Sequence, residues 1–567
     1  KPVKGLSLRA VGGANILDGQ KKEWRRAYGK YGVDGLISTA FGQKSPNSVT
    51  QNNSHRQYLT GQLIAEYKGV FGKHDINVLG GWSAEENLYE DLQGKRTNIV
   101  GNELPALNLG DTDGWSNAAD ENEWALLSGF MRASYAFAAK YLVEVNFRAD
   151  ASSRFSKKNR WGVFPSASVG WRITEEKFMQ NQHIFDNLKL RASWGQLGNQ
   201  NGLGLYDHIA SYNINGYYPF KSELGQWAVI SKLPSESRTW ETVEVKNIAV
   251  DMAFLRNRLT VTGEYFIKKN KDMLVSIEIP SIIGIDVPTG NYGELKVKGW
   301  EVTVGWQDKI KDFSYGARFN LSDQKDKLVD YGVEYNGFVA GVNQKVQGYS
   351  LGSIFGYRTD GYFTSEEEVK NSAAFNKAIT GVGDIKYIDK DGDGKISAPN
   401  DLEYLGTTTP RYTFGLNLTA AWKGFDLGVL LQGVGKRNFY LSSEVMNPYY
   451  ATWNNFSYKM HNDYWTPENP NAAFPRYYAG ANHNYQISDH WLQNAAYVRL
   501  KNLQLGYTIS PKLTKSWGIQ RLRVYFSGDN LCEYSKLNDN FDPELSDING
   551  YVYPIMRNFS FGINVTL

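Results

Sequence analysis

The chain has 567 residues, of which 62 are lysine or arginine and 59 are aspartate or glutamate, so the formal net charge is only +3. A charge this small gives no reason to expect a nucleic-acid partner. The single cysteine, Cys532, excludes an intrachain disulfide framework. No apolar run approaches the ~20 residues of a membrane-spanning helix. A chain that crosses a membrane with strands escapes this test, because only every second residue faces lipid.

Segments in which apolar and polar residues alternate recur along the whole chain. Successive side chains of a strand point to opposite faces, so a period of two predicts strands with one apolar and one polar face. With a weaker segment at 33–41, about seventeen strands are predicted. The clear ones cover residues 5–12, 58–69, 75–84, 125–137, 141–149, 166–173, 188–195, 242–254, 259–268, 297–307, 313–322, 412–422, 425–433, 497–509, 522–527 and 558–567.

The hairpin at residues 299–322 shows this pattern clearly, with small polar residues on one face and aromatics near the ends of the apolar face. A soluble sandwich would alternate too, with its apolar face turned inward. The details favour a transmembrane antiparallel β-barrel, with lipid outside and a polar lumen inside. We predict that the lipid-facing residues include Val302, Val304, Trp306, Phe313, Tyr315, Phe319, Phe559, Phe561, Ile563 and Val565. The lumen-facing residues include Arg318, Asn320, Ser560 and Asn564.

The connections between the predicted strands are of two kinds. Some are short polar turns, such as Lys73-His74 and residues 256–258, whereas those at 85–124, 196–241, 323–411 and 434–496 are long. Short turns at one rim and long extracellular loops at the other are typical of an outer-membrane barrel. In the predicted strand 497–509, the apolar phase shifts between Leu500 and Leu503. This shift predicts a β-bulge near Lys501-Asn502.

The long connections are rich in aromatic residues. These side chains either build apolar cores for the loops and edge the bilayer, or form a platform on which sugar rings or peptide side chains stack. The candidate substrate-binding residues are Trp115, Tyr217, Tyr218, Trp227, Tyr449, Tyr450 and Trp453.

Residues 389–397, DKDGDGKIS, match the first half of a calcium-binding loop. Asp389, Asp391 and Asp393 would supply side-chain oxygens, Lys395 its carbonyl, and Asp401 or Asn400 the closing ligand. The usual glutamate at the twelfth position is missing, and a plain Asp-Gly turn without metal is the alternative. We expect a structural Ca²⁺ ion on the extracellular side.

The sequence offers no pattern of catalytic residues. It has no HExxH, GxSxG or phosphate-binding motif, and the seven histidines are scattered. The acidic runs at Glu85-Glu86 and Glu366-Glu367-Glu368 fit solvated loop faces. We therefore expect that the protein is not an enzyme.

Several longer motifs, in this order, resemble the SusC/RagA-like TonB-dependent transporters of the Gram-negative outer membrane. They run along nearly the whole chain at residues 160–166, 170–172, 190–195, 198–200, 268–274, 383–387, 465–470, 500–507, 527–531 and 559–562. Each motif is weak by itself, and the ordered set carries the resemblance.

The resemblance implies a barrel of about 22 strands filled by an N-terminal plug. Residues 1–567 would then be a partial barrel domain, with the plug and the first strands outside this chain. It also implies integral outer-membrane import of oligosaccharides or peptides, with a SusD-like lipoprotein as a lid and the TonB complex pulling on the plug. Because Lys1-Pro2-Val3 leads directly into a strand, we expect a processed chain or a fragment.

Oligosaccharide import is the prediction that we favour, and three others remain open. The first is an oligopeptide importer of the same family. A passive porin or adhesin barrel would have no plug domain. A glycan-degrading enzyme on a β-rich scaffold would turn over oligosaccharide, but no candidate nucleophile supports it.

Overall fold

The computed structural model describes residues 4–27, 46–101, 103–214, 216–220, 223–230, 233–276, 282, 289–332, 338–449, 458–538, 540–545, 553 and 555–567. The weak strand predicted at 33–41 lies outside these ranges. Within them, no helix combines the length and apolarity needed to cross a membrane.

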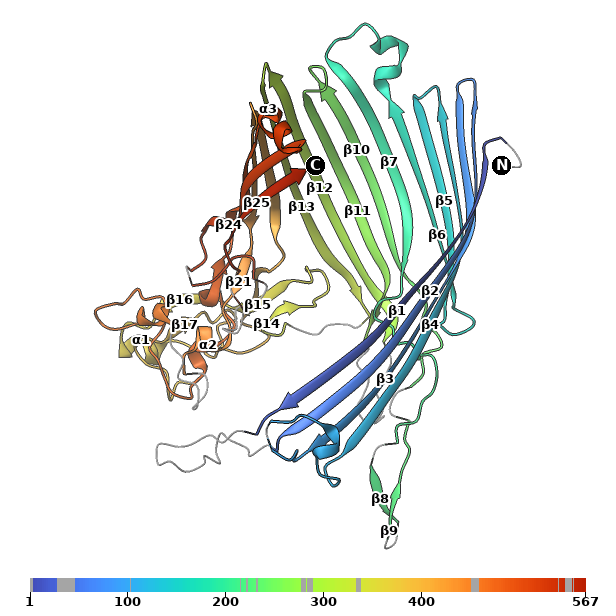
Figure 1. Ribbon diagram of the computed structural model, residues 1–567. Helices are drawn as coiled ribbons and strands as arrows, with labels where there is room; N and C mark the ends of the chain where they lie inside the picture. The colour runs from blue at the N-terminus through green and yellow to red at the C-terminus, as the bar shows by residue number, and fades with distance from the viewer. Residues whose placement is uncertain are drawn as a thin grey trace. The chain divides into compact units, whose positions relative to one another are not determined.

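Sixteen strands of the described chain form one sheet, and each of the sixteen clear predicted strands coincides with one of them. Their order in the sheet follows their order in the sequence (Figure 1). The strands are β1 (Leu6–Arg25), β2 (Ser48–Phe71), β3 (His74–Thr97), β4 (Ser116–Phe137), β5 (Tyr141–Ser152), β6 (Trp161–Arg172), β7 (Phe185–Asn199), β10 (Glu241–Phe254), β11 (Leu259–Val275), β12 (Gly290–Ile310), β13 (Phe313–Tyr331), β19 (Arg411–Trp422), β20 (Phe425–Lys436), β23 (Tyr497–Thr508), β24 (Arg521–Ser535) and β25 (Asn558–Thr566).

The remaining elements lie in the connections. The short strands are β8 (Tyr217–Phe220), β9 (Glu223–Gln226), β14 (Gly341–Gln344), β15 (Ser353–Tyr357), β16 (Thr359–Tyr362), β17 (Ile385–Tyr387), β18 (Leu402–Thr407), β21 (Asn438–Tyr440) and β22 (Leu492–Asn494). The α-helices are α1 (Glu366–Asn371), α2 (Ser443–Met446) and α3 (Pro511–Thr514). Single 3₁₀ turns occupy Leu107–Leu109, Ile173–Glu175, Lys177–Met179, Lys459–Asn462, His483–Tyr485, Asp489–Trp491 and Lys515–Trp517.

The chain divides into two compact units. Unit 1 comprises Lys1–Ser168, Gly195–Thr242 and Ser276–Asn291, and unit 2 comprises Val169–Trp194, Val243–Val275 and Tyr292–Leu567.

In unit 1, strands β2 and β3 are 24 residues long and pair without interruption, much farther than predicted. The predicted strand in β3 ends where the outward face, which is apolar at Trp82, becomes mixed, because Glu86 and Glu90 alternate there with Leu88 and Leu92. The hydrogen-bonded ladder does not depend on that apolar signal, so it continues to Thr97. The connection predicted at 85–124 therefore shrinks to the residues between β3 and β4.

In unit 2, strand β23 contains the predicted bulge. Leu430 of β20 pairs with Asn502, and the next residue, Leu431, pairs with Leu500. Lys501 is thus left without a partner in the ladder. The same shift appears on the other side of β23, toward β24, between Leu500 and Asn502.

The registers of unit 2 confirm the separation into two faces. Val304 pairs with Phe319 on one face, and Thr303 pairs with Asn320 on the other. A hollow of about 1010 Å³ is bordered by residues of the polar face, including Thr303, Gln307, Arg318, Asn417 and Thr419. Trp306 and Tyr315, which are predicted to face lipid, also border this hollow. On the last strand, Phe559, Phe561, Ile563 and Val565 are exposed. Asn564 borders a second hollow of about 610 Å³. Ser560 shares that face because side chains alternate along a strand.

Candidate functional site

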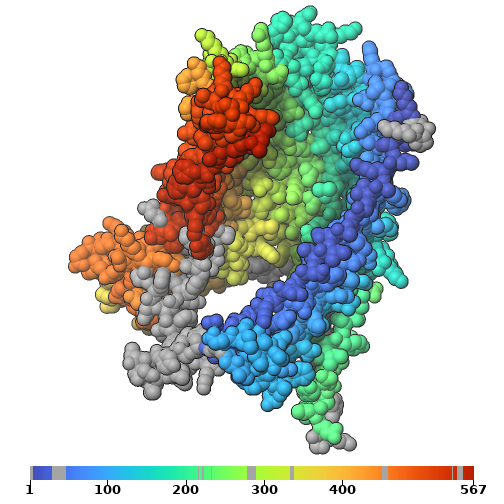
Figure 2. Space-filling model, in the orientation of Figure 1, coloured from blue at the N-terminus to red at the C-terminus, as the bar shows by residue number. Residues whose placement is uncertain are grey.

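Two long connections of unit 2 fold together into one body, which we call the loop module: residues 338–409, 437–449 and 458–496. It contains three small sheets, in the orders β14-β15-β18, β16-β17 and β21-β22. Figure 1 shows these short strands with α1 and α2 gathered at one end of the long strands of the same unit. In the space-filling view, the described residues of the second connection, in orange, form one compact mass (Figure 2).

The loop module has a hydrophobic core of its own, which explains why such long connections are ordered. Trp491 is 1% exposed, and Phe474 and Tyr485 pack against it with ring centroids 5.7 Å away in each case. Burying a large apolar side chain stabilises a fold by roughly 1.5–3 kcal/mol. The buried core residues are Tyr357, Ile385, Tyr387, Ile396, Leu402, Phe439, Leu441, Val445, Met460, Phe474, Tyr485, Trp491 and Ala495, with Leu537 from the segment after β24.

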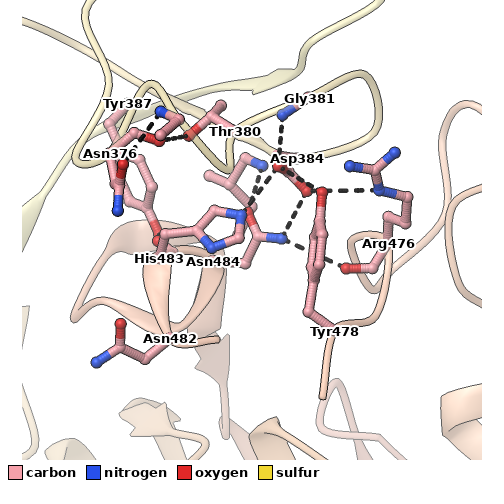
Figure 3. A network of polar contacts seen from close by, with 12 residues as sticks. Asn376, Thr380, Gly381, Asp384, Tyr387, Arg476, Tyr478, Asn482, His483 and Asn484 are labelled. Atoms are coloured by element: carbon pink, nitrogen blue, oxygen red, sulfur yellow. Dashed lines mark hydrogen bonds and ion pairs between the residues drawn. The ribbon is translucent and has the colours of Figure 1, made fainter. Parts of the chain in front are cut away.

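A buried carboxylate, Asp384, joins the two connections (Figure 3). Its Oδ2 accepts hydrogen bonds from the Gly381 N–H at 2.8 Å and the Tyr478 hydroxyl at 3.0 Å. The Nε2 atom of His483 lies 2.9 Å from the same oxygen, and the Asn484 amide donates to Oδ1 at 2.9 Å. The Asp384 side chain, which has no solvent exposure, therefore binds Gly381 of its own connection and residues 478–484 of the other connection.

Gly383, beside this carboxylate, needs to be glycine for two reasons. Its φ of +90° lies in the left-handed region, and a Cβ atom here would come 2.3 Å from the Trp465 ring. The Gly383 carbonyl also accepts the N–H of Arg476. Sequence patterns alone did not identify Asp384 as a structural centre. The only sequence feature that singled out Asp384 was its position in the 383–387 motif. Its neighbours show no alternation of apolar and polar residues.

The structure brings three of the predicted calcium ligands together. Asp389, Asp391 and Asp393 each have a carboxylate oxygen within 4.8 Å of the others. The two oxygens of Asp389 accept the N–H groups of Gly392 and Gly394, at 2.7 and 2.8 Å. These backbone bonds, that from Gly394 foremost, lower the pKa of Asp389. Such a set of hard carboxylate oxygens on a tight turn suits Ca²⁺.

Asp401, the predicted closing ligand, is 1% exposed and bonds to the backbone of the same loop. Its Oδ1 accepts the Lys390 N–H at 2.8 Å, and its Oδ2 accepts the Ser397 N–H at 2.7 Å. Asn400 donates to Asp391 at 2.7 Å. The N–H of Lys395 bonds to Asp393 at 2.8 Å. Asp401 therefore fixes the base of the loop on which the three aspartates stand.

The predicted aromatic platform is divided between the two units. In unit 1, Trp115 precedes β4, Tyr217 and Tyr218 lie on β8, and Trp227 follows β9. Tyr217 and Tyr218 are 65% and 59% exposed, and as neighbours on a strand they face opposite sides. Figure 1 shows the β8–β9 hairpin projecting from the long strands. In unit 2, Tyr449 packs edge-on against Tyr477, with 5.7 Å between ring centroids. The remaining candidates, Tyr450 and Trp453, lie outside the described residues.

Comparison with known proteins agrees with this architecture. The family described as "TonB dependent receptor-like, beta-barrel" matches residues 15–531. TonB-dependent receptor P3 of Formosa agariphila is 28% identical over 91% of this chain and 52% of its own length. TonB-dependent receptor SusC of Bacteroides thetaiotaomicron is 28% identical over 78% of this chain and 43% of its own length.

Among solved structures, that of the RagAB peptide transporter has the same fold. It superposes with a TM-score of 0.83 at 23% identity, over all of this chain and 60% of that one. The chain spans about half the length of the curated relatives that it matches. The family match extends over most of the chain, and the strands and faces are those of a membrane barrel. The chain therefore belongs to the TonB-dependent receptor β-barrel family of the outer membrane, as a SusC/RagA-like member.

Proposed function

We propose that the protein of which this chain is part imports oligosaccharides across the outer membrane in a TonB-dependent manner. In this proposal a SusD-like surface lipoprotein covers the extracellular loops and helps to hold the substrate. The TonB complex acts through a plug domain outside these 567 residues. Family membership supports import, and the relative named SusC supports this branch of the family.

The observation that carries the proposal is the loop module. Connections that serve only to join strands need no core, yet these enclose Trp491 and Phe474 and are tied together at Asp384. A folded extracellular body can present a fixed surface to a ligand and to a partner protein. The exposed aromatics Tyr217, Tyr218 and Trp227 would supply rings for stacking on sugars.

The principal alternative is an oligopeptide importer, since the RagAB structure is described as that of a peptide transporter. At 23% identity that likeness concerns the fold alone. A passive porin-like barrel is the second alternative. The proposal includes no catalytic step, so incubation with the purified protein is expected to leave oligosaccharides intact.

Uptake by whole cells separates these functions. A deletion strain complemented with the full-length gene is given labelled oligosaccharides or oligopeptides of similar size, with TonB present or deleted. We expect uptake of an oligosaccharide that needs both the gene and TonB. Peptide uptake under the same control would establish the peptide importer. Uptake that survives the loss of TonB would establish a passive barrel.

We also propose that residues 389–401 bind a structural Ca²⁺ ion. Three carboxylates within 4.8 Å repel one another, and a divalent cation would offset that repulsion. Asp389, Asp391 and Asp393 would be the side-chain ligands, with the Lys395 carbonyl. Asp401, whose oxygens already accept two N–H groups, would add a free lone pair.

Calorimetry and hydrogen exchange test this site in the full-length protein. Adding Ca²⁺ after EDTA treatment should release binding heat and slow exchange in residues 389–401. The variant with Asp389, Asp391 and Asp393 all changed to Asn should show neither effect. As the matched control, Asp360→Asn alters a carboxylate of the same module that is 67% exposed. Absence of binding heat, with an equally ordered loop in EDTA, would exclude the metal and leave the import proposal unaffected.

A further inference from the structure

On the lipid-facing side of strands β12 and β13, the side chains change from apolar to positively charged with distance from the short turn. Paired rows of this face are apolar near the short turn: Trp306–Ala317, Val304–Phe319 and Val302–Leu321. The next row pairs Trp300 with Asp323. The two rows beyond it consist of lysine alone: Lys298 pairs with Lys325, and Lys296 pairs with Lys327.

The four lysines share the lipid-facing side with the apolar rows. Positions 296, 298, 300, 302 and 304 differ by two, so their side chains leave the strand on one face. The register shift between β12 and β13 lies at Glu294/Leu295, beyond the lysines. The ladder from Lys296 to Ile310 is continuous, so no bulge turns the lysines to the other side.

The lysine rows lie at the level of the lipid headgroups. A strand needs about 9–11 residues to cross the hydrocarbon core, which is the distance from Ile310 to Trp300. Tryptophan is favoured at the boundary between hydrocarbon and headgroups. The short turn marks the periplasmic end, so Lys296, Lys298, Lys325 and Lys327 follow the hydrocarbon at the extracellular leaflet.

These lysines lack a counter-charge within the described chain. Like charges directly opposite each other destabilise a sheet, and here two such pairs are adjacent. Of the nearby carboxylates, Asp323 pairs with Arg411, and Glu294 lies 3.7 Å from Lys269. No ion pair joins any of the four lysines to a described carboxylate, and Lys298, Lys325 and Lys327 are exposed.

We propose that this lysine patch binds the phosphate groups of an anionic lipid in the outer leaflet. Each phosphate would lie between opposed lysines and relieve their repulsion, while acyl chains pack on Val302, Leu321 and the Trp300 ring. The positive charge of the lysines favours a ligand that carries phosphate. The apolar rows beside them favour a lipid, whose acyl chains can pack there, over an acidic protein. Basic residues beside a membrane attract anionic lipid headgroups, and the attraction weakens in salt.

Native mass spectrometry of the full-length receptor in neutral detergent tests the proposal. The probes are lipid A bearing phosphate and its dephosphorylated form. Changing all four patch lysines to Gln should weaken binding of the phosphorylated lipid about tenfold or more, and high salt should do the same. The matched control changes Lys73, Lys311, Lys512 and Lys515, exposed lysines on the short-turn side, to Gln. The heat-modifiable gel mobility of each variant verifies folding.

Equal binding by the patch and control variants would overturn the proposal, as would equal affinity of the native receptor for the two lipids. The variant Lys298→Glu gives an independent readout, because it places a carboxylate opposite Lys325. It should raise the unfolding temperature in lipid-free detergent and reduce the further rise that phosphorylated lipid A produces. A patch with only a structural role would show the same lipid-induced rise before and after this change.

Discussion

At the scale of single residues, Asp384 shows how one buried charge holds distant parts of the chain. A carboxylate without solvent contact is tolerated only when donors surround it. Asp384 has a backbone N–H, a phenol, an imidazole and an amide, contributed from both sides of the loop module. Its Arg476 neighbour, 4.0 Å away, stacks over the Tyr478 ring and adds positive charge. The side chain therefore acts as a tie between two connections that are distant in sequence.

Changing Asp384 to Asn should loosen the loop module and leave the strands intact. The asparagine side chain has the size of aspartate but no charge. Its NH₂ group is a hydrogen-bond donor, and the surrounding groups of Asp384, such as His483 and Tyr478, are donors as well. Hydrogen bonds to charged groups contribute about 1.5–3 kcal/mol, so a loss of that order is expected. Hydrogen exchange should accelerate in residues 381–387 and 476–485. Glu367→Gln, an exposed change in the same module, is the control. Unchanged exchange in the Asp384 variant would contradict the role of a tie.

The two faces of β12 should differ in how much a charged substitution destabilises the barrel: a charge on the lipid-facing side should cost more than a charge on the polar side. Val304 lies in an apolar row with Phe319, whereas Thr303 lines the polar hollow. Arginine on the lipid face near the bilayer centre costs about 2–4 kcal/mol, so Val304→Arg should destabilise the barrel by that amount. Thr303→Arg should cost far less. Denaturant unfolding of the full-length receptor in lipid vesicles measures both. Equal losses would contradict the assigned faces.

At the scale of elements, the loop module contains the buried histidine His461 and the partly buried histidine His490. His461 is 2% exposed, accepts the Tyr458 N–H at Nδ1 and donates from Nε2 to the Val445 carbonyl. Burial lowers the pKa of His461, and burial likewise lowers the pKa of His490. His490 faces the Tyr362 hydroxyl and the Ala473 carbonyl. The adjacent carboxylate, Asp489, bonds to Arg358.

The module should therefore lose stability on acidification. Both histidines are neutral when folded, and an unfolded histidine has a pKa near 6.5. Above that pH neither state is protonated, so stability is complete; below it the unfolded state binds more protons, and stability falls until the folded pKa is reached. Hydrogen exchange in residues 458–491 should accelerate as the pH falls below about 6.5.

The double variant His461→Gln and His490→Gln should flatten this pH dependence, because glutamine does not titrate. His183→Gln, at an exposed histidine, should leave it unchanged. A pH profile that is the same in all three proteins would show that other groups control the module.

At the scale of the whole molecule, the sequence predicts the membrane part far better than the rest. Lipid on one side and polar groups on the other impose a period of two, so every clear strand could be located. Even the bulge at Lys501 follows from the shift between Leu500 and Leu503. The apolar signal ends where the lipid ends, so the prediction stops β2 at residue 58 and places the outer part of β3 in the connection 85–124.

The loop module could not be predicted because its order comes from packing between distant segments. Tyr357, Phe439 and Trp491 meet in one core, yet no local period marks any of them. The aspartate loop was recognisable because its geometry is local, within five residues of sequence. The tie at Asp384 depends on residues about 100 positions away, which a single sequence does not connect.

The outer half of β3 determines what surface this receptor presents to proteins that approach it from outside. From Glu86 to Thr97 the strand is paired on both sides, by β2 and by β4, for most of its length. At about 3.3 Å per residue, this rigid extension is about 40 Å long. Loops of such reach would shift their shape, whereas a hydrogen-bonded wall keeps one conformation. A large protein that approaches this strand from outside would therefore meet one fixed backbone surface, because the ladder holds the strand in one conformation.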